Sequence, residues 1–207
     1  MTIAFKHLST LEERSVNQMK PVRTFIAINL SSSTRDAAES IMGDLAQCGD
    51  AVRIVHRENL HITLKFLGEI QIEETVNVCR VVTQAALMTP KFSVVASGTG
   101  AFPDRERLRV IWWGTTEGSE QLGALHDLID QGLSNLGYPG ETKKYHPHVT
   151  LARVRSRELD ADKLRAVMDK YTEEPSVEFL AEEIVVYSSF LGPDGPRYEV
   201  VGRSPLA

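Results

Sequence analysis

The tetrapeptide HITL at residues 61–64 lies inside the longer stretch LHITLKFLGE, which spans residues 60–69. A second copy, HVTL at residues 148–151, lies inside HPHVTLAR at residues 146–153. Histidine is scarce, with 6 in 207 residues, so chance rarely repeats a pattern that contains it. The copies are separated by nearly half of the chain that follows residue 20, which predicts two related halves.

Both copies read as β-strands, in which alternate side chains project to the same face. His61 and Thr63 would therefore project together, while the aliphatic residues between and after them point to the core. The second copy repeats the arrangement with His148 and Thr150. If the two strands lie near a pseudo-twofold axis, two imidazoles and two hydroxyls line one groove.

This set of groups fits the hydrolysis of a phosphodiester. In-line attack requires a proton to leave water on one side of phosphorus and another to reach the leaving oxygen opposite. Imidazole can perform either task near neutral pH, so two histidines can divide the roles. Threonine hydroxyls can donate hydrogen bonds to the non-bridging oxygens. The scheme requires neither a metal ion nor another cofactor.

Other interpretations of the histidines exist. A single histidine on a strand usually has a structural role, but the duplication favours a catalytic pair. His146 and His148 could form a metal-binding pair, since residues two apart share a strand face. Pro147 between them can break the strand, and no carboxylate cluster lies nearby in the sequence, which disfavours this alternative.

Strand and helix patterns are interspersed, which indicates an antiparallel or mixed sheet rather than a doubly wound parallel one. Ser31 and the polar residues after it predict the start of a helix, and Gly68 is expected to end a strand. The expected strands are 23–30, 52–55, 60–67, 92–95, 109–114, 148–154, 178–190 and 198–201, and the expected helices are 35–48, 72–88, 120–136 and 159–171.

Length and composition predict a cytoplasmic protein with a single domain over residues 21–207. Residues 1–20 form a polar extension that we expect to be flexible, without the features of a signal peptide. No apolar run approaches the roughly 18 residues that a membrane span requires. Cys48 and Cys79 have no metal-ligand spacing, so we expect reduced thiols.

Charge is unevenly distributed along the chain. The formal net charge of −5 disfavours non-specific coating of nucleic acid. Residues 143–157 nevertheless contain five basic and no acidic residues, and Arg105, Arg107 and Arg109 form a second basic cluster. A basic groove on an acidic body suits an enzyme that binds one phosphate end, although either cluster could simply be solvated surface.

The two motifs and their surroundings resemble the two-histidine (2H) phosphoesterase superfamily, in particular its RNA 2′,3′-cyclic phosphodiesterase or 2′-5′ RNA ligase branch. The resemblance covers roughly residues 21–203. Besides the motifs, it includes RTFIAI at residues 23–28, Phe102-Pro103 with residues 107–112, and YSSFLGPDGPRY at residues 187–198.

The resemblance implies a bilobal α+β fold over residues 21–207. Two mainly antiparallel sheets related by pseudo-twofold symmetry would face a central cleft, with helices on the outside. The resemblance also implies hydrolysis of a 2′,3′-cyclic phosphate, on RNA ends or small cyclic nucleotides, to a 2′-phosphomonoester. His61 would be the general acid on the 3′ oxygen and His148 the general base, with Thr63, Thr150 and Arg153 on the phosphate. No cofactor, membrane or obligate protein partner is implied.

Three residues pose geometric questions. Strand parity places Arg153 opposite His148, so a bulge or the end of the strand must turn it inward. Phe25 could stack on the terminal base or belong to the core. Lys65 shares the parity of His61 and could flank the phosphate, or it could be exposed to solvent. Two other functions remain possible: physiological ligation of 2′-5′ ends, and a non-catalytic RNA-binding or nucleotide-binding module.

Overall fold

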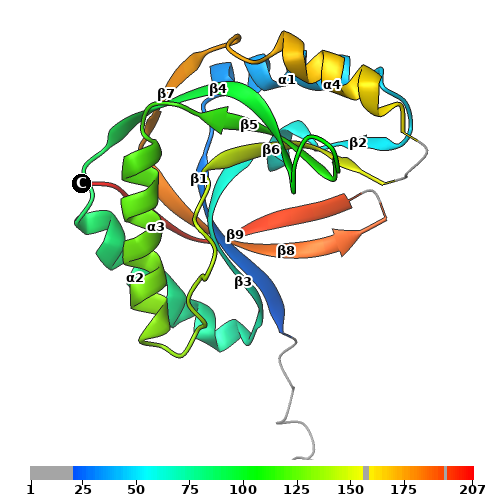
Figure 1. The fold of residues 1–207 in the computed structure, drawn as a ribbon. Helices are drawn as coiled ribbons and strands as arrows, with labels where there is room; N and C mark the ends of the chain where they lie inside the picture. Colours follow the sequence, from blue (N-terminus) through cyan, green and yellow to red (C-terminus); the bar gives the residue numbers. More distant parts are fainter. Residues whose placement is uncertain (1–20, 156–158, 194) are drawn as a thin grey trace, which may run out of the picture.

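Strands and helices alternate along the chain, as the sequence predicts (Figure 1). The computed structural model describes residues 21–155, 159–193 and 195–207, so the predicted N-terminal extension lies outside the described residues. The strands are β1 Val22–Asn29, β2 Val52–Ile54, β3 His61–Ile70, β4 Phe92–Phe102, β5 Val110–Thr115, β6 His148–Val154, β7 Val177–Ala181, β8 Glu183–Gly192 and β9 Gly195–Pro205. The α-helices are α1 Ser32–Ala46, α2 Thr75–Leu87, α3 Ser119–Ser134 and α4 Ala161–Lys170, and the 3₁₀ helices are η1 Arg57–Asn59 and η2 Ile72–Glu74.

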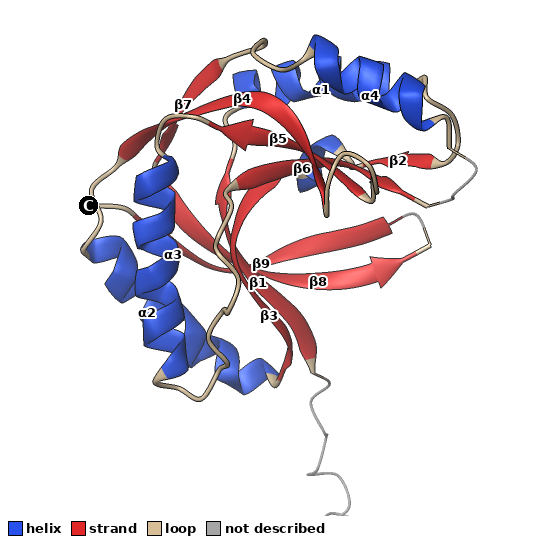
Figure 2. Ribbon diagram, in the orientation of Figure 1, coloured by secondary structure: helices blue, strands red, loops and turns tan. Residues whose placement is uncertain are grey.

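Within the described part of the chain, all nine strands belong to one curled sheet with antiparallel pairing (Figure 2). The order is β7-β4-β5-β6-β3-β1-β8-β9, and β2 pairs with β6. The innermost strands, β3 and β6, carry the two histidine motifs. They meet at the paired residues Ile62 and Val149. The predicted α+β fold is confirmed, and the two expected sheets are the halves of this one sheet.

Each half of the sheet has its own pair of helices (Figures 1 and 2). Helices α1 and α4 cover the half that contains β4, β5 and β6, whereas α2 and α3 cover the half that contains β1, β3 and β8. The predicted polar cap of α1 is confirmed, because the Ser31 hydroxyl accepts a hydrogen bond from the Thr34 N–H at 3.1 Å. The helix begins at Ser32, three residues before the expected start. Among the described helices, none is long and apolar enough to cross a membrane.

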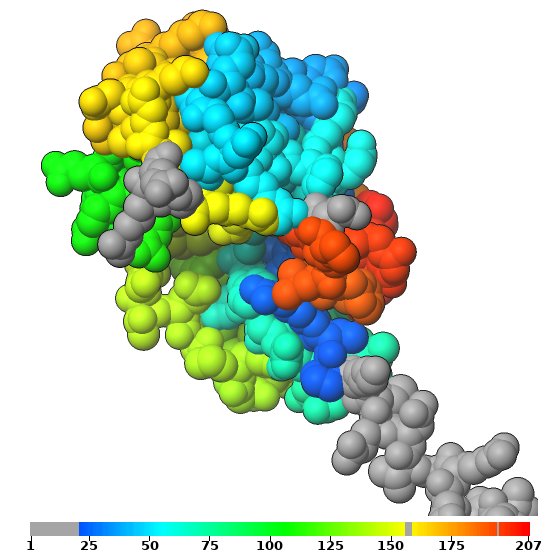
Figure 3. Space-filling model, turned by 90° about the vertical axis from the view of Figure 1, so that its right-hand side faces the viewer, coloured from blue at the N-terminus to red at the C-terminus, as the bar shows by residue number. Residues whose placement is uncertain are grey.

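Strands of both halves reach the surface on one side of the molecule (Figure 3). The end of β6 (yellow) lies there between the region of β2 (cyan) and the hairpin of β8 and β9 (orange to red). The Asn59 side-chain amide donates a hydrogen bond to the Pro196 carbonyl at 2.8 Å. This bond ties the hairpin to the turn that precedes β3.

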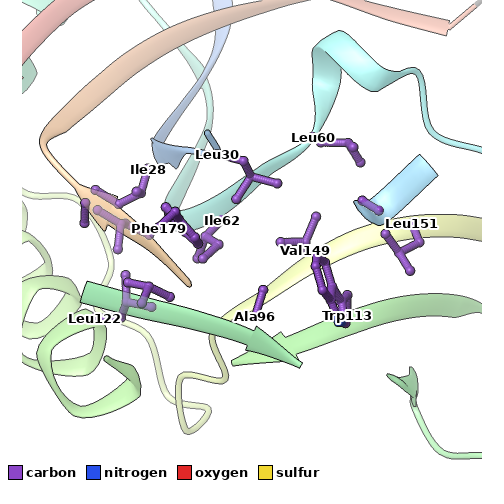
Figure 4. Packing of buried hydrophobic residues seen from close by; sticks show 14 of the residues in the cluster. Ile28, Leu30, Leu60, Ile62, Ala96, Trp113, Leu122, Val149, Leu151 and Phe179 are labelled. Atoms are coloured by element: carbon purple, nitrogen blue, oxygen red, sulfur yellow. The ribbon is translucent and has the colours of Figure 1, made fainter. Parts of the chain in front are cut away.

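The hydrophobic core lies between the sheet and the helices, and both histidine motifs contribute to it (Figure 4). Ile62 and Val149 are completely buried, as are Leu151, Trp113 and Leu122. Since neighbouring side chains on a strand alternate between faces, this burial directs the motif histidines and threonines toward the opposite face. The expected polar face backed by core is confirmed.

Several strand predictions were wrong. The strands expected at residues 92–95 and 198–201 are much longer, at Phe92–Phe102 and Gly195–Pro205. Residues 178–190 form two strands rather than one, because the chain crosses between the halves at Glu182: β7 pairs with β4, and β8 pairs with β1. Local hydrophobic patterns contain no information about such a crossing. Gly68 does not end β3 either. It adopts φ +73°, which glycine tolerates, at a bulge, and the strand continues to Ile70.

Candidate active site

The two histidine motifs lie side by side on the sheet. In an antiparallel pair, the match of Ile62 with Val149 sets His61 across from Thr150 and Thr63 across from His148. All four side chains are only partly buried. The sheet thus brings together the two imidazoles and two hydroxyls that the sequence predicts.

Both imidazoles are oriented by a carbonyl two residues earlier in the chain. Nδ1 of His61 lies 2.7 Å from the Asn59 carbonyl oxygen, and Nδ1 of His148 lies 2.7 Å from the His146 carbonyl oxygen. A carbonyl can only accept a hydrogen bond, so both Nδ1 atoms carry the proton. Nε2 is therefore the nitrogen that can exchange protons with a ligand, and on His61 it lies 3.0 Å from the Thr63 hydroxyl.

Aromatic rings surround both histidines. The His61 ring stacks on Phe25 with centroids 4.9 Å apart and meets the edge of Tyr198 at 5.6 Å. The His148 ring meets Phe102 edge-on at 4.9 Å and lies 6.2 Å from Trp112. These contacts hold each imidazole in place and shield it from water.

Burial lowers the pKa of both histidines. The pKa of His61 falls to about 4, chiefly through desolvation, and the positive charges of His148, Arg35 and Arg153 lower it further against the opposing Asn59 hydrogen bond. Desolvation also lowers the pKa of His148, with smaller contributions from His146 and Arg153. Both imidazoles are thus neutral at pH 7 in the free protein, and an anionic ligand is needed to favour a protonated one.

The low pKa of His61 predicts a pH-dependent stability. Between pH 6.5 and 4 the unfolded chain binds a proton at this residue that the folded chain does not, so stability falls as pH falls. From pH 7.5 to 5 the loss should be about 2 kcal/mol. The free energy of unfolding would be measured in urea at both pH values for the wild type and for His61→Asn. Its decrease from pH 7.5 to 5 should be about 2 kcal/mol smaller in His61→Asn than in the wild type. Equal losses in the two proteins would contradict the lowered pKa.

A bulge in β6 turns Arg153 toward the motif face. In the pairing with β5, Trp112 faces Thr150 and Ile111 faces Ala152, which leaves Leu151 as the extra residue. Leu151 and Ala152 are both buried, and the alternation then restarts with an exposed Arg153. Of the two expected ways to turn Arg153 inward, a bulge or the strand end, the structure shows the bulge.

The same bulge occurs in β3 and overturns the expectation for Lys65. Relative to β1, Leu64 is the extra residue there, so Lys65 is buried on the core side and Phe66 takes the position that Arg153 has in β6. Lys65 forms an ion pair with Asp130 of α3 and donates to the Pro139 carbonyl at 3.0 Å. It neither shares the face of His61 nor contacts solvent. Lys65 and Ala152 occupy equivalent places in the two motifs, four residues after each histidine. Aligning the motifs would therefore have indicated the buried position of Lys65.

The Lys65–Asp130 pair predicts a stability effect. Burial raises the pKa of Asp130, but the Lys65 ammonium and the Glu141 N–H outweigh it and hold that pKa below its ordinary value. Asp130→Ala would leave a buried ammonium without its carboxylate, at a cost of about 3 kcal/mol. Tm should fall by about 5–10 °C. The control, Asp162→Ala, removes an exposed partner of Arg165 and should change Tm by less than about 2 °C. Equal effects of the two variants would contradict a stabilising role of the buried pair.

Phe25 lies on the motif face and is buried among aromatic rings. Its side chain is 3% exposed and contacts the rings of His61, Tyr187 and Tyr198. The ring also borders the cleft over His61 and Thr63, so stacking on the terminal base stays a prediction for this residue. An exposed aromatic ring at the same cleft is Phe66, over which the Arg23 guanidinium lies at 4.7 Å from the ring centroid.

A cleft of about 790 Å³ lies over the motif face and is lined by His61, Thr63 and Thr150. His148 stands beside these residues, across from Thr63, and is not itself part of the lining. Of the described residues that line the cleft, none is acidic and five are arginines: Arg23, Arg53, Arg109, Arg153 and Arg155. Sequence reasoning missed Arg23 and Arg53, because each belongs to a strand that only the fold brings here. It missed Phe66 because the bulge at Leu64 changes the face on which that ring lies. In the described part of the chain, no three His, Cys, Asp or Glu side chains are grouped to hold a metal ion.

The family model described as the 2′-5′ RNA ligase superfamily matches residues 28–190. The chain belongs to this superfamily. The RNA 2′,3′-cyclic phosphodiesterase of Methanocaldococcus jannaschii is 33% identical over 180 residues, which is 87% of this chain and 98% of that protein. The RNA 2′,3′-cyclic phosphodiesterase of Aquifex aeolicus is 34% identical over 189 residues, or 88% and 96% of the two chains.

Solved structures of similar proteins agree with membership of the 2′-5′ RNA ligase superfamily. TT0787 of Thermus thermophilus superimposes with a TM-score of 0.74 at 26% identity and covers 89% of this chain and 97% of its own. LigT of E. coli in complex with 3′-AMP gives a TM-score of 0.72 at 25% identity, and the superposition covers 91% of this chain and 99% of LigT.

Proposed function

We propose that this chain hydrolyses 2′,3′-cyclic phosphates at RNA ends, or on small nucleotides, to 2′-phosphomonoesters. The observation that supports this most directly is the pair of His-x-Thr motifs side by side on one sheet face, each with its histidine Nε2 available for proton transfer. Relatives named RNA 2′,3′-cyclic phosphodiesterase add support, because their sequences are 32–34% identical to this one over most of the chain.

In the proposed mechanism, Nε2 of His148 removes a proton from water as the water oxygen attacks phosphorus. The bond from phosphorus to the 3′ oxygen breaks on the opposite side, and Nε2 of His61 gives its proton to that oxygen. The Thr63 and Thr150 hydroxyls and the Arg153 guanidinium stabilise the charge on the non-bridging oxygens. The products are a 3′ hydroxyl and a 2′ phosphate, and the proton returns to His61 by exchange through solvent.

Substrate binding would prepare His61 for this role. Its pKa of about 4 leaves it neutral in the free protein, whereas a general acid must be protonated. The negative charge of the bound cyclic phosphate raises the pKa of a nearby imidazole and so favours the protonated form. His148, also neutral, can accept a proton directly.

Ligation is a second activity of the same site. A 5′ hydroxyl in place of water would give a 2′-5′ linkage through the same acid and base, and the family description favours this possibility. The two activities are separated by mixing an RNA that ends in a cyclic phosphate with an RNA that has a 5′ hydroxyl, and by comparing the rates of hydrolysis and ligation.

We place the enzyme in the cytoplasm, where the free thiols of Cys48 and Cys79 stay reduced.

The proposal is tested by measuring hydrolysis of 2′,3′-cyclic AMP after dialysis against EDTA. We expect turnover at the same rate with and without the chelator, because the mechanism uses only side chains of this chain. Activity that disappears with EDTA and returns with a divalent ion would contradict the mechanism. Tight binding of the nucleotide without any turnover would instead favour a non-catalytic module.

A further inference from the structure

A second cavity of about 830 Å³ adjoins the catalytic cleft. The two share three lining residues, Arg109, Val154 and Arg155, so they meet at the end of β6. Its volume is in the range of cavities that hold small molecules. Its remaining walls combine apolar side chains with one acidic and one further basic residue: Pro103, Leu108, Leu159, Ala161, Glu106 and Arg107.

The arginines around these cavities differ in their partners. Six of the eight described arginines outside the catalytic cleft pair with carboxylates, including Arg107 of the second cavity: Arg57, Arg105, Arg107, Arg165, Arg197 and Arg203. In contrast, the five that line the catalytic cleft form no ion pair with any carboxylate of the described residues. Arg35 and Arg80 donate hydrogen bonds to carbonyl or amide oxygens instead. Most arginines outside the cleft are thus neutralised by a carboxylate, whereas the five that line it are available to an anionic ligand.

The pairing of the strands places these positive charges close together. Arg53 of β2 and Arg153 of β6 are directly opposite each other, a placement in which like charges destabilise a sheet. The Arg109 carbonyl accepts a hydrogen bond from the Val154 N–H at 2.9 Å, so Arg109 lies beside the segment that leads to Arg155. The positive charge therefore continues from the catalytic cleft into the second cavity, as a chain of phosphates requires.

We propose that the second cavity binds the nucleotide on the 5′ side of the cyclic end, with Arg109 and Arg155 on the phosphodiester that joins it to the terminal nucleotide. The proposal rests on the proposed function and extends it to the nucleotide that precedes the reactive end. Leu108, Leu159 and Pro103 offer an apolar wall to an unpaired base, and guanidinium planes also stack on bases. Interactions with the non-reacting nucleotide can then increase kcat/KM.

The test compares two substrates, 2′,3′-cyclic AMP and a dinucleotide that ends in the same cyclic adenylate. For the wild type, kcat/KM should be at least about ten times higher for the dinucleotide, since a charge-assisted phosphate contact contributes about a tenfold effect. The ratio of the two kcat/KM values should fall about tenfold in the Arg109→Ala/Arg155→Ala double variant. On the dinucleotide, this variant should also reduce the slope of log(kcat/KM) against log salt by about 0.7 per lost contact.

Arg105→Ala is the matched control, because Arg105 belongs to the same loop as Arg109 but pairs with Asp169 and lines neither cavity. It should leave the substrate ratio unchanged. Arg109 and Arg155 are exposed, so equal urea midpoints should confirm that the double variant folds. A wild type without preference for the dinucleotide, or an unchanged ratio in the double variant, would overturn this proposal alone. Failure to hydrolyse either substrate would overturn the proposed function as well.

Discussion

Replacing His61 or His148 with alanine is expected to lower kcat by about a thousandfold while KM changes by less than about threefold. Each imidazole transfers a proton only in the transition state, and such a transfer increases the rate by a factor of about 10²–10⁴. The assay is steady-state hydrolysis of 2′,3′-cyclic AMP. The two losses should not multiply in the double variant, because acid and base act in one step.

Binding and folding controls belong with this experiment. Adenosine 2′-phosphate, the expected product, should bind both variants with a Kd close to that of the wild type, because Thr63, Thr150 and Arg153 remain. Both variants should also retain a cooperative thermal transition. If either variant kept more than about a tenth of wild-type kcat, the paired acid–base mechanism would be wrong.

Arg153→Ala is expected to lower kcat/KM by about a hundredfold, the usual effect of removing one charged group that stabilises a developing anion. The lost charge should also move the pH profile. Because the guanidinium lowers the pKa of both histidines, its removal raises these pKa values, and the acidic limb of kcat/KM should move to higher pH.

Arg153→Lys separates charge from geometry. It should restore the position of the acidic limb but only part of the rate, since an ammonium cannot make the paired hydrogen bonds of a guanidinium. Arg105→Ala again serves as the control and should leave both quantities unchanged. If Arg153→Ala resembled Arg105→Ala, Arg153 would have no role at the phosphate.

The sequence predicts most of the site because the chemistry is contained in a local, duplicated pattern. Strand parity alone places His61 with Thr63 and His148 with Thr150, and the buried Ile62 and Val149 between them fix that orientation in the fold. The expected helices and most strands also follow from local periodicity. The same approach fails at residues 178–190, where the chain passes between halves without a change in hydrophobic pattern.

The other errors have one physical cause. A bulge adds a residue and reverses parity, so the position of every later side chain in that strand changes face. Parity therefore gives the wrong face for Lys65 and for Arg153 alike. For Arg153 the resemblance implied either a bulge or a turn at the strand end, and applying the bulge to the first motif as well would have moved Lys65 into the core. Arg23 and Arg53 could not be found in this way, because only long-range strand pairing brings them to the cleft.

The identity of the phosphomonoester formed from a 2′,3′-cyclic oligonucleotide tests the central claim most directly. The wild type would be incubated with the substrate in EDTA, and the product would be identified by ³¹P NMR against 2′-phosphate and 3′-phosphate standards. The mechanism predicts the 2′-phosphomonoester alone, because the acid protonates the 3′ oxygen. A 3′-phosphomonoester, or an unchanged cyclic phosphate, would contradict it.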